Sequence, residues 1–120
     1  MTDRAIPLCL LRVLRDHSDE KHILSIADIQ KHLEASDLHP DRRTLYTHFD
    51  VLTAMGYEIS DFKANGKGYY LMSREVEPSE AHLLCDAVCA LPFIPEKQTL
   101  DLIRKLQSLV SVYERRHIHN

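Results

Sequence analysis

The chain has 120 residues, of which 44% are hydrophobic, and its formal net charge at pH 7 is -3. This length allows one domain, or a small domain with an appendage, and the apolar fraction is ordinary for a soluble protein with a modest core. No apolar run in the sequence approaches the roughly 20 residues that span a bilayer, and Met1 to Arg4 lack the pattern of a secretory signal. Three cysteines without the spacing of a disulfide scaffold indicate a reducing compartment, so we expect a cytoplasmic protein.

The first half of the chain predicts three helices. An apolar stripe with helical spacing runs over residues 6–17. Ser25 and Asp28 have the form of a capping box, with Asp in place of Glu or Gln, and predict a second helix from Ser25 to Ala35. Pro40 disfavours helix at the residue before it, so residues 36–40 are expected to form a turn.

The third helix is expected to begin at Asp41 and to run from Arg42 to Met55, with Gly56 as its stop. At about 100° per residue, one sector faces the core and the opposite sector faces solvent. The core sector holds Leu45, Phe49 and Leu52; the solvent sector holds Arg43, Thr47, Asp50 and Ala54, with Thr44 and Tyr46 beside it.

Two strand-like segments, residues 57–62 and 68–72, follow this helix, and Asn65-Gly66 between them is suited to positive φ. We therefore expect a β-hairpin that turns at Asn65-Gly66. The predicted fold class is mainly α with a small β wing (α+β): a winged helix-turn-helix followed by two amphipathic helices.

The charged and proline-containing segment from Ser73 to Ser79 predicts a boundary between domains at 1–75 and 76–120. Two short amphipathic helices are expected beyond it, at residues 78–91 and 95–110, whereas residues 113–120 are basic and show no pattern. Helices this short cannot cover each other fully, so we expect them to pack on the first domain or to form a homodimer interface.

The predicted surface chemistry favours contact with double-stranded DNA. Arg43 and Thr47 could read base edges, since Arg pairs with guanine, whereas Arg42 and Tyr46 suit phosphates. Tyr46 could instead pack against the second helix. Thr44, His48, Lys63 and Lys67 complete the set of expected DNA-binding residues, although Lys63 and Lys67 could equally protect an edge strand. The negative net charge opposes this interpretation, but the acids concentrate at residues 16–20 and 75–80, away from these bases.

Metal binding and catalysis have little support in the sequence. His82, Cys85 and Cys89 fall on one helix face, but no fourth ligand is evident, so we expect no metal and no cofactor. No phosphate-binding glycine loop, nucleophile elbow or metalloprotease motif is present, and we do not expect an enzyme.

Several segments in order resemble the WYL-domain transcriptional regulators, a bacterial DeoR-like winged-helix family. Residues 42–46 with Leu52 and residues 55–57 resemble the family's helix-turn-helix, and residues 68–71 resemble the return strand of its wing. Residues 83–88, 93–94, 96–97 and 102–106 resemble the linker helices, so the resemblance spans roughly residues 5–110. Thr47-His48 departs from the family, where a basic residue followed by Asp is frequent.

The resemblance implies a transcriptional regulator whose effector, if it has one, binds the WYL domain, which is absent from this chain. An alternative is a winged helix that binds proteins and not nucleic acid, which the negative net charge favours. A second alternative is a metal-responsive or redox-responsive switch that uses His82, Cys85 and Cys89.

Overall fold

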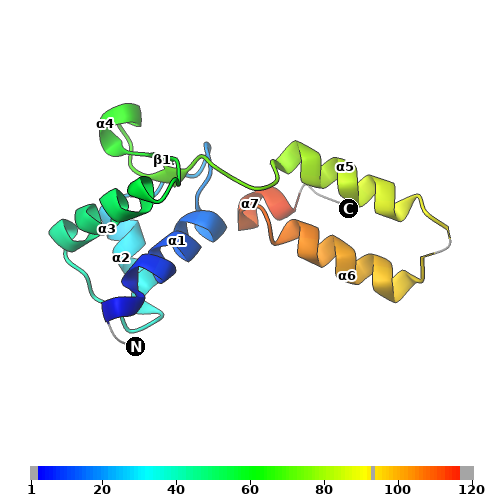
Figure 1. Cartoon of the computed structure of the whole chain (residues 1–120), viewed down its shortest axis with the longest axis horizontal. Coiled ribbons are helices and arrows are strands. Elements are labelled where there is room, and N and C mark those ends of the chain that lie inside the picture. The colour runs from blue at the N-terminus through cyan, green and yellow to red at the C-terminus, as the bar shows by residue number, and fades with distance from the viewer. Residues whose placement is uncertain (1–2, 93, 117–120) are drawn as a thin grey trace. The chain divides into compact units, whose positions relative to one another are not determined.

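A computed structural model describes residues 3–92 and 94–116 of the chain and divides it into two compact units, Met1–Ser73 and Arg74–Asn120 (Figure 1). The described part is mainly helical and contains a small two-stranded antiparallel sheet. Within the described residues, no helix combines the length and the apolar character that crossing a membrane requires.

The first unit is built on three helices that pack around one core. A short 3-10 turn, η1 (Asp3–Ala5), leads into α1 (Ile6–His17), which packs against both α2 (Ile26–Glu34) and α3 (Arg42–Ala54). The core takes side chains from all three helices and from the segments between them: Ile6, Leu10, Val13, Leu14, Leu24, Ile29, Leu33, Leu38, Leu45, Phe49, Leu52, Tyr69 and Leu71. The core residues expected on α3 are therefore confirmed.

The predicted cap of α2 is present. The Asp28 backbone N–H donates to Ser25 Oγ at 3.0 Å, and the Ser25 N–H donates to a carboxylate oxygen of Asp28 at 3.0 Å. These two bonds satisfy backbone donors that a helix start otherwise leaves unpaired. After α2 the chain turns with Asp37 at φ 55°, and the Gln30 side-chain amide donates to the Pro40 carbonyl at 3.1 Å.

The sheet is shorter than the sequence predicts. β1 (Ile59–Ser60) pairs antiparallel with β2 (Tyr70–Leu71), with Ile59 opposite Leu71. A third segment joins this pair, because Leu24 and Tyr69 exchange two backbone hydrogen bonds of 2.9 and 2.7 Å. The segment that precedes α2 is thus attached to the return strand.

The prediction of a hairpin that turns at Asn65-Gly66 is wrong in its turn. A short helix, α4 (Phe62–Asn65), lies between the strands, capped by Asp61, whose carboxylate accepts from the Ala64 N–H at 2.8 Å. Only Gly66 has positive φ, at 74°, and it ends α4. An Asp cap followed by residues that tolerate helix outweighed the tendency of Asn-Gly to form a two-residue turn.

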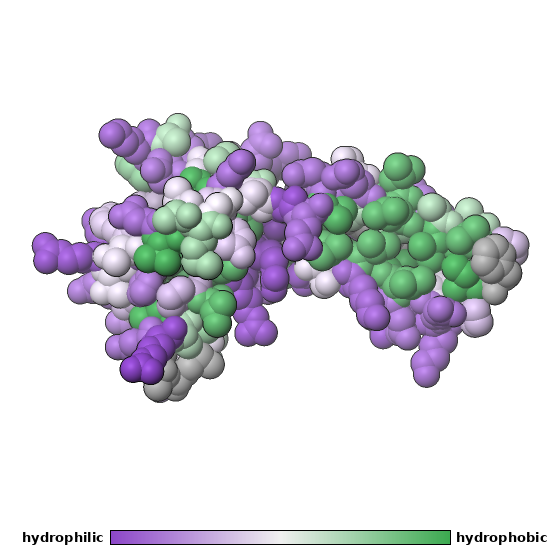
Figure 2. All heavy atoms as spheres, viewed as in Figure 1, coloured by the Kyte–Doolittle hydropathy of each residue, from purple (hydrophilic) through white to green (hydrophobic). Residues whose placement is uncertain are grey.

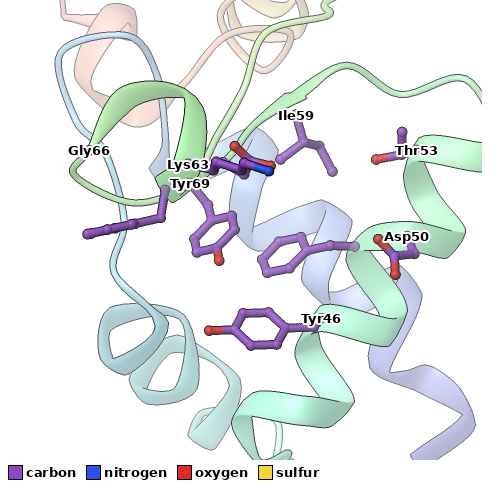
Figure 3. Close-up of a pocket in the computed structure, with 10 residues that line it drawn as sticks. Tyr46, Asp50, Thr53, Ile59, Lys63, Gly66 and Tyr69 are labelled. Atoms are coloured by element: carbon purple, nitrogen blue, oxygen red, sulfur yellow. The ribbon is translucent and has the colours of Figure 1, made fainter.

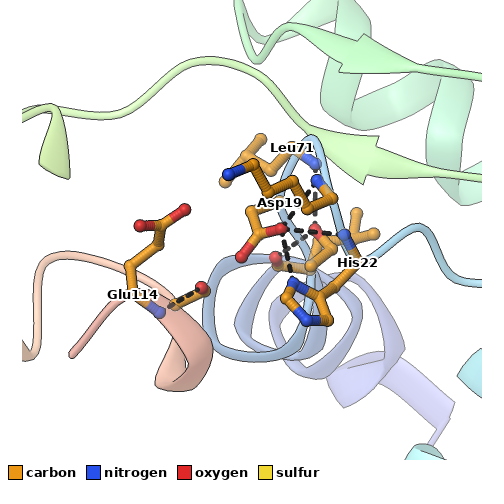
Figure 4. A network of polar contacts seen from close by, with 8 residues as sticks. Asp19, His22, Leu71 and Glu114 are labelled. Carbon is orange, nitrogen blue, oxygen red and sulfur yellow. Dashed lines mark hydrogen bonds and ion pairs between the residues drawn. The ribbon is translucent and has the colours of Figure 1, made fainter. Parts of the chain in front are cut away.

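A buried polar network fastens the end of α1 to β2 (Figure 4). Ser18 is fully buried; its hydroxyl donates to the Leu14 carbonyl and accepts from the Leu71 N–H at 3.0 Å. Asp19 Oδ1 accepts from the backbone N–H groups of Lys21 and His22 at 2.9 and 2.8 Å, and it also lies 2.8 Å from His22 Nδ1. These bonds fix the loop after α1 without any strand of its own.

The second unit is a pair of antiparallel helices, α5 (Pro78–Cys89) and α6 (Glu96–Gln107), followed by α7 (Val112–Arg115). Among the described residues of this unit, the buried members of the core are Ala81, Cys85, Ile103 and Val110. Both long helices end before the predicted residues 91 and 110. Residues 113–120 show no pattern in the sequence, yet residues 113–115 belong to α7, which Ser111 caps and which Arg115 Nε joins to the Gln107 carbonyl by a hydrogen bond of 2.9 Å. Residues 117–120 lie outside the described part.

Gly68 is required by the close approach of two backbones. A Cβ added there would lie 2.2 Å from the Leu24 carbonyl oxygen, whereas a Cβ at Gly66 would meet nothing within 4 Å. We predict that Gly68→Ala lowers the free energy of unfolding by about 3 kcal/mol, since neither backbone can give way. Gly66→Ala should lower it by about 1 kcal/mol, through positive φ alone. Urea denaturation of both variants tests the order, which an equal or larger loss for Gly66→Ala would contradict.

The stability of the first unit should depend on pH through His32. Its ring stacks on that of His17, with centroids 4.1 Å apart. Burial lowers the pKa of His32 below its ordinary value of 6.5, and the neighbouring His17 lowers it further. The unfolded chain therefore binds the proton more readily, so this contribution to stability is present above pH 6.5 and is lost as the pH falls through the lowered folded value. We predict that His32→Gln flattens the fall in unfolding free energy between about pH 7.5 and 5; an unchanged slope would exclude His32 as its source.

Candidate nucleic-acid interface

The caps of α3 fix the ends of the helix, and its buried residues fix which face is accessible to solvent. Asp41 caps it, with its carboxylate accepting from the Thr44 N–H at 2.8 Å. Hydrogen bonds from Thr44 lower the pKa of Asp41, so the cap is ionised at neutral pH. Gly56, at φ 103°, follows the last turn as predicted. Since Leu45 and Phe49 face the core, the rotation of the helix is fixed and its opposite side is left to solvent.

The predicted site residues on α3 differ in accessibility. Arg42, Arg43 and Thr47 are exposed. The Thr47 hydroxyl donates to the Arg43 carbonyl at 3.2 Å, so its oxygen remains able to accept. Thr44 and His48 are only half-buried, and His48 Nδ1 is enclosed without a hydrogen-bond partner among the described residues. His48 is therefore turned partly toward the protein and is the weakest member of the predicted set.

The side chain of Tyr46 projects from α3 toward the segment 59–69 (Figure 3). Its neighbour Tyr69 is buried and stacks on Phe49, with ring centroids 4.4 Å apart and ring planes 6° from parallel. Burial raises the pKa of Tyr69, and the adjacent Tyr46 raises it further. This aromatic stack attaches the residue before β2 to α3. Tyr46 itself remains 42% exposed, so it is available for contact while it also packs.

Two surface hollows of different charge meet at Tyr46. One, of about 320 Å³, is bordered by the bases Arg42 and Lys67 and by residues 25–27 at the start of α2. Because a helix start presents backbone N–H groups, this hollow has the chemistry of a phosphate contact. The other, of about 710 Å³, is bordered by Asp50, Asp61 and Lys63, together with Tyr46 and other aromatic rings. Its two carboxylates make it unfavourable for phosphate.

Asn65 organises the loop that carries both predicted wing lysines. Its side-chain amide donates to Ser60 Oγ at 3.0 Å and to the Gly68 carbonyl at 2.9 Å, and its Oδ1 accepts from the N–H groups of Lys67 and Gly68 at 2.7 and 2.9 Å. Lys63 and Lys67 are both exposed, but they border different hollows. Lys67 therefore shares a hollow with Arg42, whereas Lys63 lies with the two carboxylates.

The structural role of this loop differs from the prediction. The sequence predicts Asn65 only as a turn residue and does not predict Asp61 as a helix cap. The signal for the cap was present, because Asp61 stands three residues before Ala64, the spacing of a side-chain cap. Three of the four hydrogen bonds of Asn65 are local, because they reach Lys67 and Gly68, two and three residues ahead, as Asn side chains often do in turns. The bond to Ser60, five residues back, depends on the helix α4 between them.

The candidate metal ligands of the second unit do not form a site among the described residues. Cys85 is buried in the small core, where burial raises the pKa of its thiol, and Cys89 is exposed. His82 Nε2 lies 3.2 Å from an Asp86 carboxylate oxygen. A search of the described residues finds no group of three or more side chains able to hold a metal ion.

Comparison of the chain with protein-family models, with curated proteins and with solved structures finds no significant match. The resemblance to WYL-domain regulators therefore stays a prediction.

Asn65→Ala should loosen the loop that carries Lys67. We predict that the Lys67 and Gly68 amide protons exchange with solvent at least about tenfold faster, because both lose their acceptor. Amide hydrogen exchange followed by NMR measures this directly. Lys63→Ala, in the same loop but outside the Asn65 network, is the matched control and should leave both rates unchanged; equal acceleration in the two variants would refute the role of Asn65.

Proposed function

We propose that this chain binds double-stranded DNA sequence-specifically as part of a transcriptional regulator. In this proposal α3 enters the major groove and the segment 59–71 acts as a wing on the flanking backbone. The observation that carries it is the hollow in which Arg42 and Lys67, from separate elements, border the start of α2. Bases from a helix and from a loop that converge beside a helix start form a suitable contact for a phosphate of the duplex.

The order of the elements supports a winged helix-turn-helix. The first unit runs helix, paired segment at Leu24, two helices, then two strands, and the three paired segments are antiparallel. In a winged helix the second of the two successive helices is the recognition helix, which is α3 here. The short helix α4 inside the wing makes it more compact than a plain hairpin.

The dimensions and side chains of α3 also fit this role. A helix of about 10–12 Å diameter fits a major groove about 12 Å wide. Arg43 and Thr47, one turn apart, are exposed near the helix start, where base edges are usually read. Arg43 can bond two acceptors of guanine, and Arg42 is directed to the backbone in this arrangement.

The negative net charge does not oppose the proposal at the distance over which phosphates act. At physiological salt a charge is screened beyond about 8 Å, so the charges close to α3 decide whether a phosphate is attracted. Asp41 is engaged as a cap. Asp50 is the one acid on the solvent sector of α3, and there it can accept a hydrogen bond from a cytosine amino group.

The second hollow favours an alternative function. Its carboxylates Asp50 and Asp61, together with the exposed Phe62, suit a basic peptide segment better than a nucleic acid. In that case the winged helix would be a protein-interaction module. DNA binding whose affinity falls steeply with salt would show that many phosphates are contacted, and it would exclude the protein-interaction module as the main activity.

Selection from randomised duplex DNA, followed by salt titration of any enriched site, tests the proposed function. We expect an enriched sequence and an affinity that falls steeply as salt rises, since each phosphate contact releases a counterion. Failure to enrich any sequence even at low salt would contradict sequence-specific binding by this chain.

Arg43→Ala should weaken binding to the selected site by about 1–3 kcal/mol and relax the preference at one base pair. Arg12→Ala, an exposed arginine on α1, is the matched control and should change neither. Titration of both variants against the selected site and a site altered at single positions measures the effect. If Arg43→Ala weakens all sequences equally, Arg43 contacts phosphate and does not read a base.

A further inference from the structure

The helices of the second unit have more apolar surface than they bury against each other. On α6, the residues Ile103, Leu106 and Leu102 span an arc of about 100° at 100° per residue. Only Ile103 is fully covered by α5, and Leu102 and Leu106 stay half-buried. On α5, Ala81 and Cys85 are buried, whereas Leu84 is 44% exposed. The hairpin is therefore incompletely covered on one side.

These uncovered residues belong to one continuous face. Because α5 and α6 are antiparallel, residues rotated in the same sense from the buried stripe lie on the same side of the hairpin. Leu84 and Ala87 on α5, and Leu102 and Leu106 on α6, are all rotated in that sense. Figure 2 shows hydrophobic residues gathered over α5 and α6 on the side in view. We name these four residues the hairpin face.

The charges around the hairpin face suit a second copy of the same chain. The four residues of the face carry no charge, so a partner of opposite charge is not needed. The charged residues at its edge have opposite signs: Glu80 on α5 and Lys105 on α6, both exposed. A two-fold axis that runs along the helices lays α5 of one copy over α6 of the other, which brings Glu80 toward Lys105 of the second copy.

We propose that the chain forms a two-fold symmetric dimer in which two α5–α6 hairpins pair through their hairpin faces into a four-helix bundle. With the axis along the helices, every neighbouring pair of helices is antiparallel, so the helix dipoles oppose favourably. The second copy supplies the apolar cover that four buried core residues do not provide. This inference concerns Arg74–Asn120 and does not depend on DNA binding.

The test is sedimentation of the full chain, without DNA, over a range of concentrations. We expect wild type to sediment as two copies of the 13.9 kDa chain. Leu84→Glu should raise the dimer dissociation constant at least about 100-fold, because the two-fold axis brings the new charge into the apolar interface twice. Leu100→Glu is the matched control: Leu100 has almost the same exposure, 43%, but it is rotated the opposite way from the buried stripe.

A monomer at about 100 µM wild-type chain overturns the proposal, and the hairpin face would then be covered by another segment or another protein. An unchanged dissociation constant for Leu84→Glu, or equal effects of the two glutamates, overturns it as well.

The arrangement of the two copies is tested at the edge, where substitutions leave the apolar core intact. Lys105→Glu should weaken the dimer about tenfold by opposing Glu80, and adding Glu80→Gln should restore part of the loss. Gln is chosen because its side-chain oxygen can still accept the hydrogen bond that Glu80 accepts from the Glu77 N–H, so the capping box of α5 is preserved. Lys97→Glu, on the opposite side of α6, should have no effect; weakening by Lys97→Glu and not by Lys105→Glu would exclude the proposed axis.

Discussion

The first unit depends on the backbone pairing between Leu24 and Tyr69. Two hydrogen bonds hold Leu24, two residues before α2, against Tyr69, the residue before β2, although 45 positions separate them in the sequence. The pairing is close enough that only glycine fits at position 68. Because Tyr69 also stacks on Phe49, the same residue joins the start of α2, the return strand and α3. The convergence of Arg42 and Lys67 at one hollow is a consequence of this pairing.

Local signals are sufficient to predict the three long helices of this unit, α1, α2 and α3, but not α4. The Ser25–Asp28 box and Gly56 are short-range features whose chemistry is complete within one turn, and each lies at its predicted position. Asp41 is predicted only as the start of α3, and the structure adds its role as the cap. The wing loop could not be predicted in the same way. Its geometry depends on Asn65 bonds to Ser60 and Gly68, which are neighbours only after the strands have paired.

The candidate site was predictable by composition but not by arrangement. Helical periodicity correctly put Arg43 and Thr47 opposite the core residues Leu45 and Phe49. It could not separate Lys63 from Lys67, since both flank the same Asn-Gly in the sequence; the capped turn of α4 sends them to hollows of different charge. It also could not reveal that a ring nitrogen of His48 is enclosed.

The two units contrast in how fully their apolar residues are buried, and this contrast bears on function. The first unit buries residues from three helices and the paired segments in one core, and Arg43 and Thr47 of α3 stay exposed outside it. The second unit has a core of four buried residues and leaves leucines of both long helices exposed. One helix of about four turns reads too few base pairs to define a specific site in a genome, so specific recognition generally requires two reading heads. If the second unit completes its core only in a dimer, dimerisation stabilises this unit and at the same time brings two copies of α3 together. In that arrangement, the residues proposed to bind DNA and the residues proposed to bring two copies together are separated along the chain, so each set can be altered without disturbing the packing of the other.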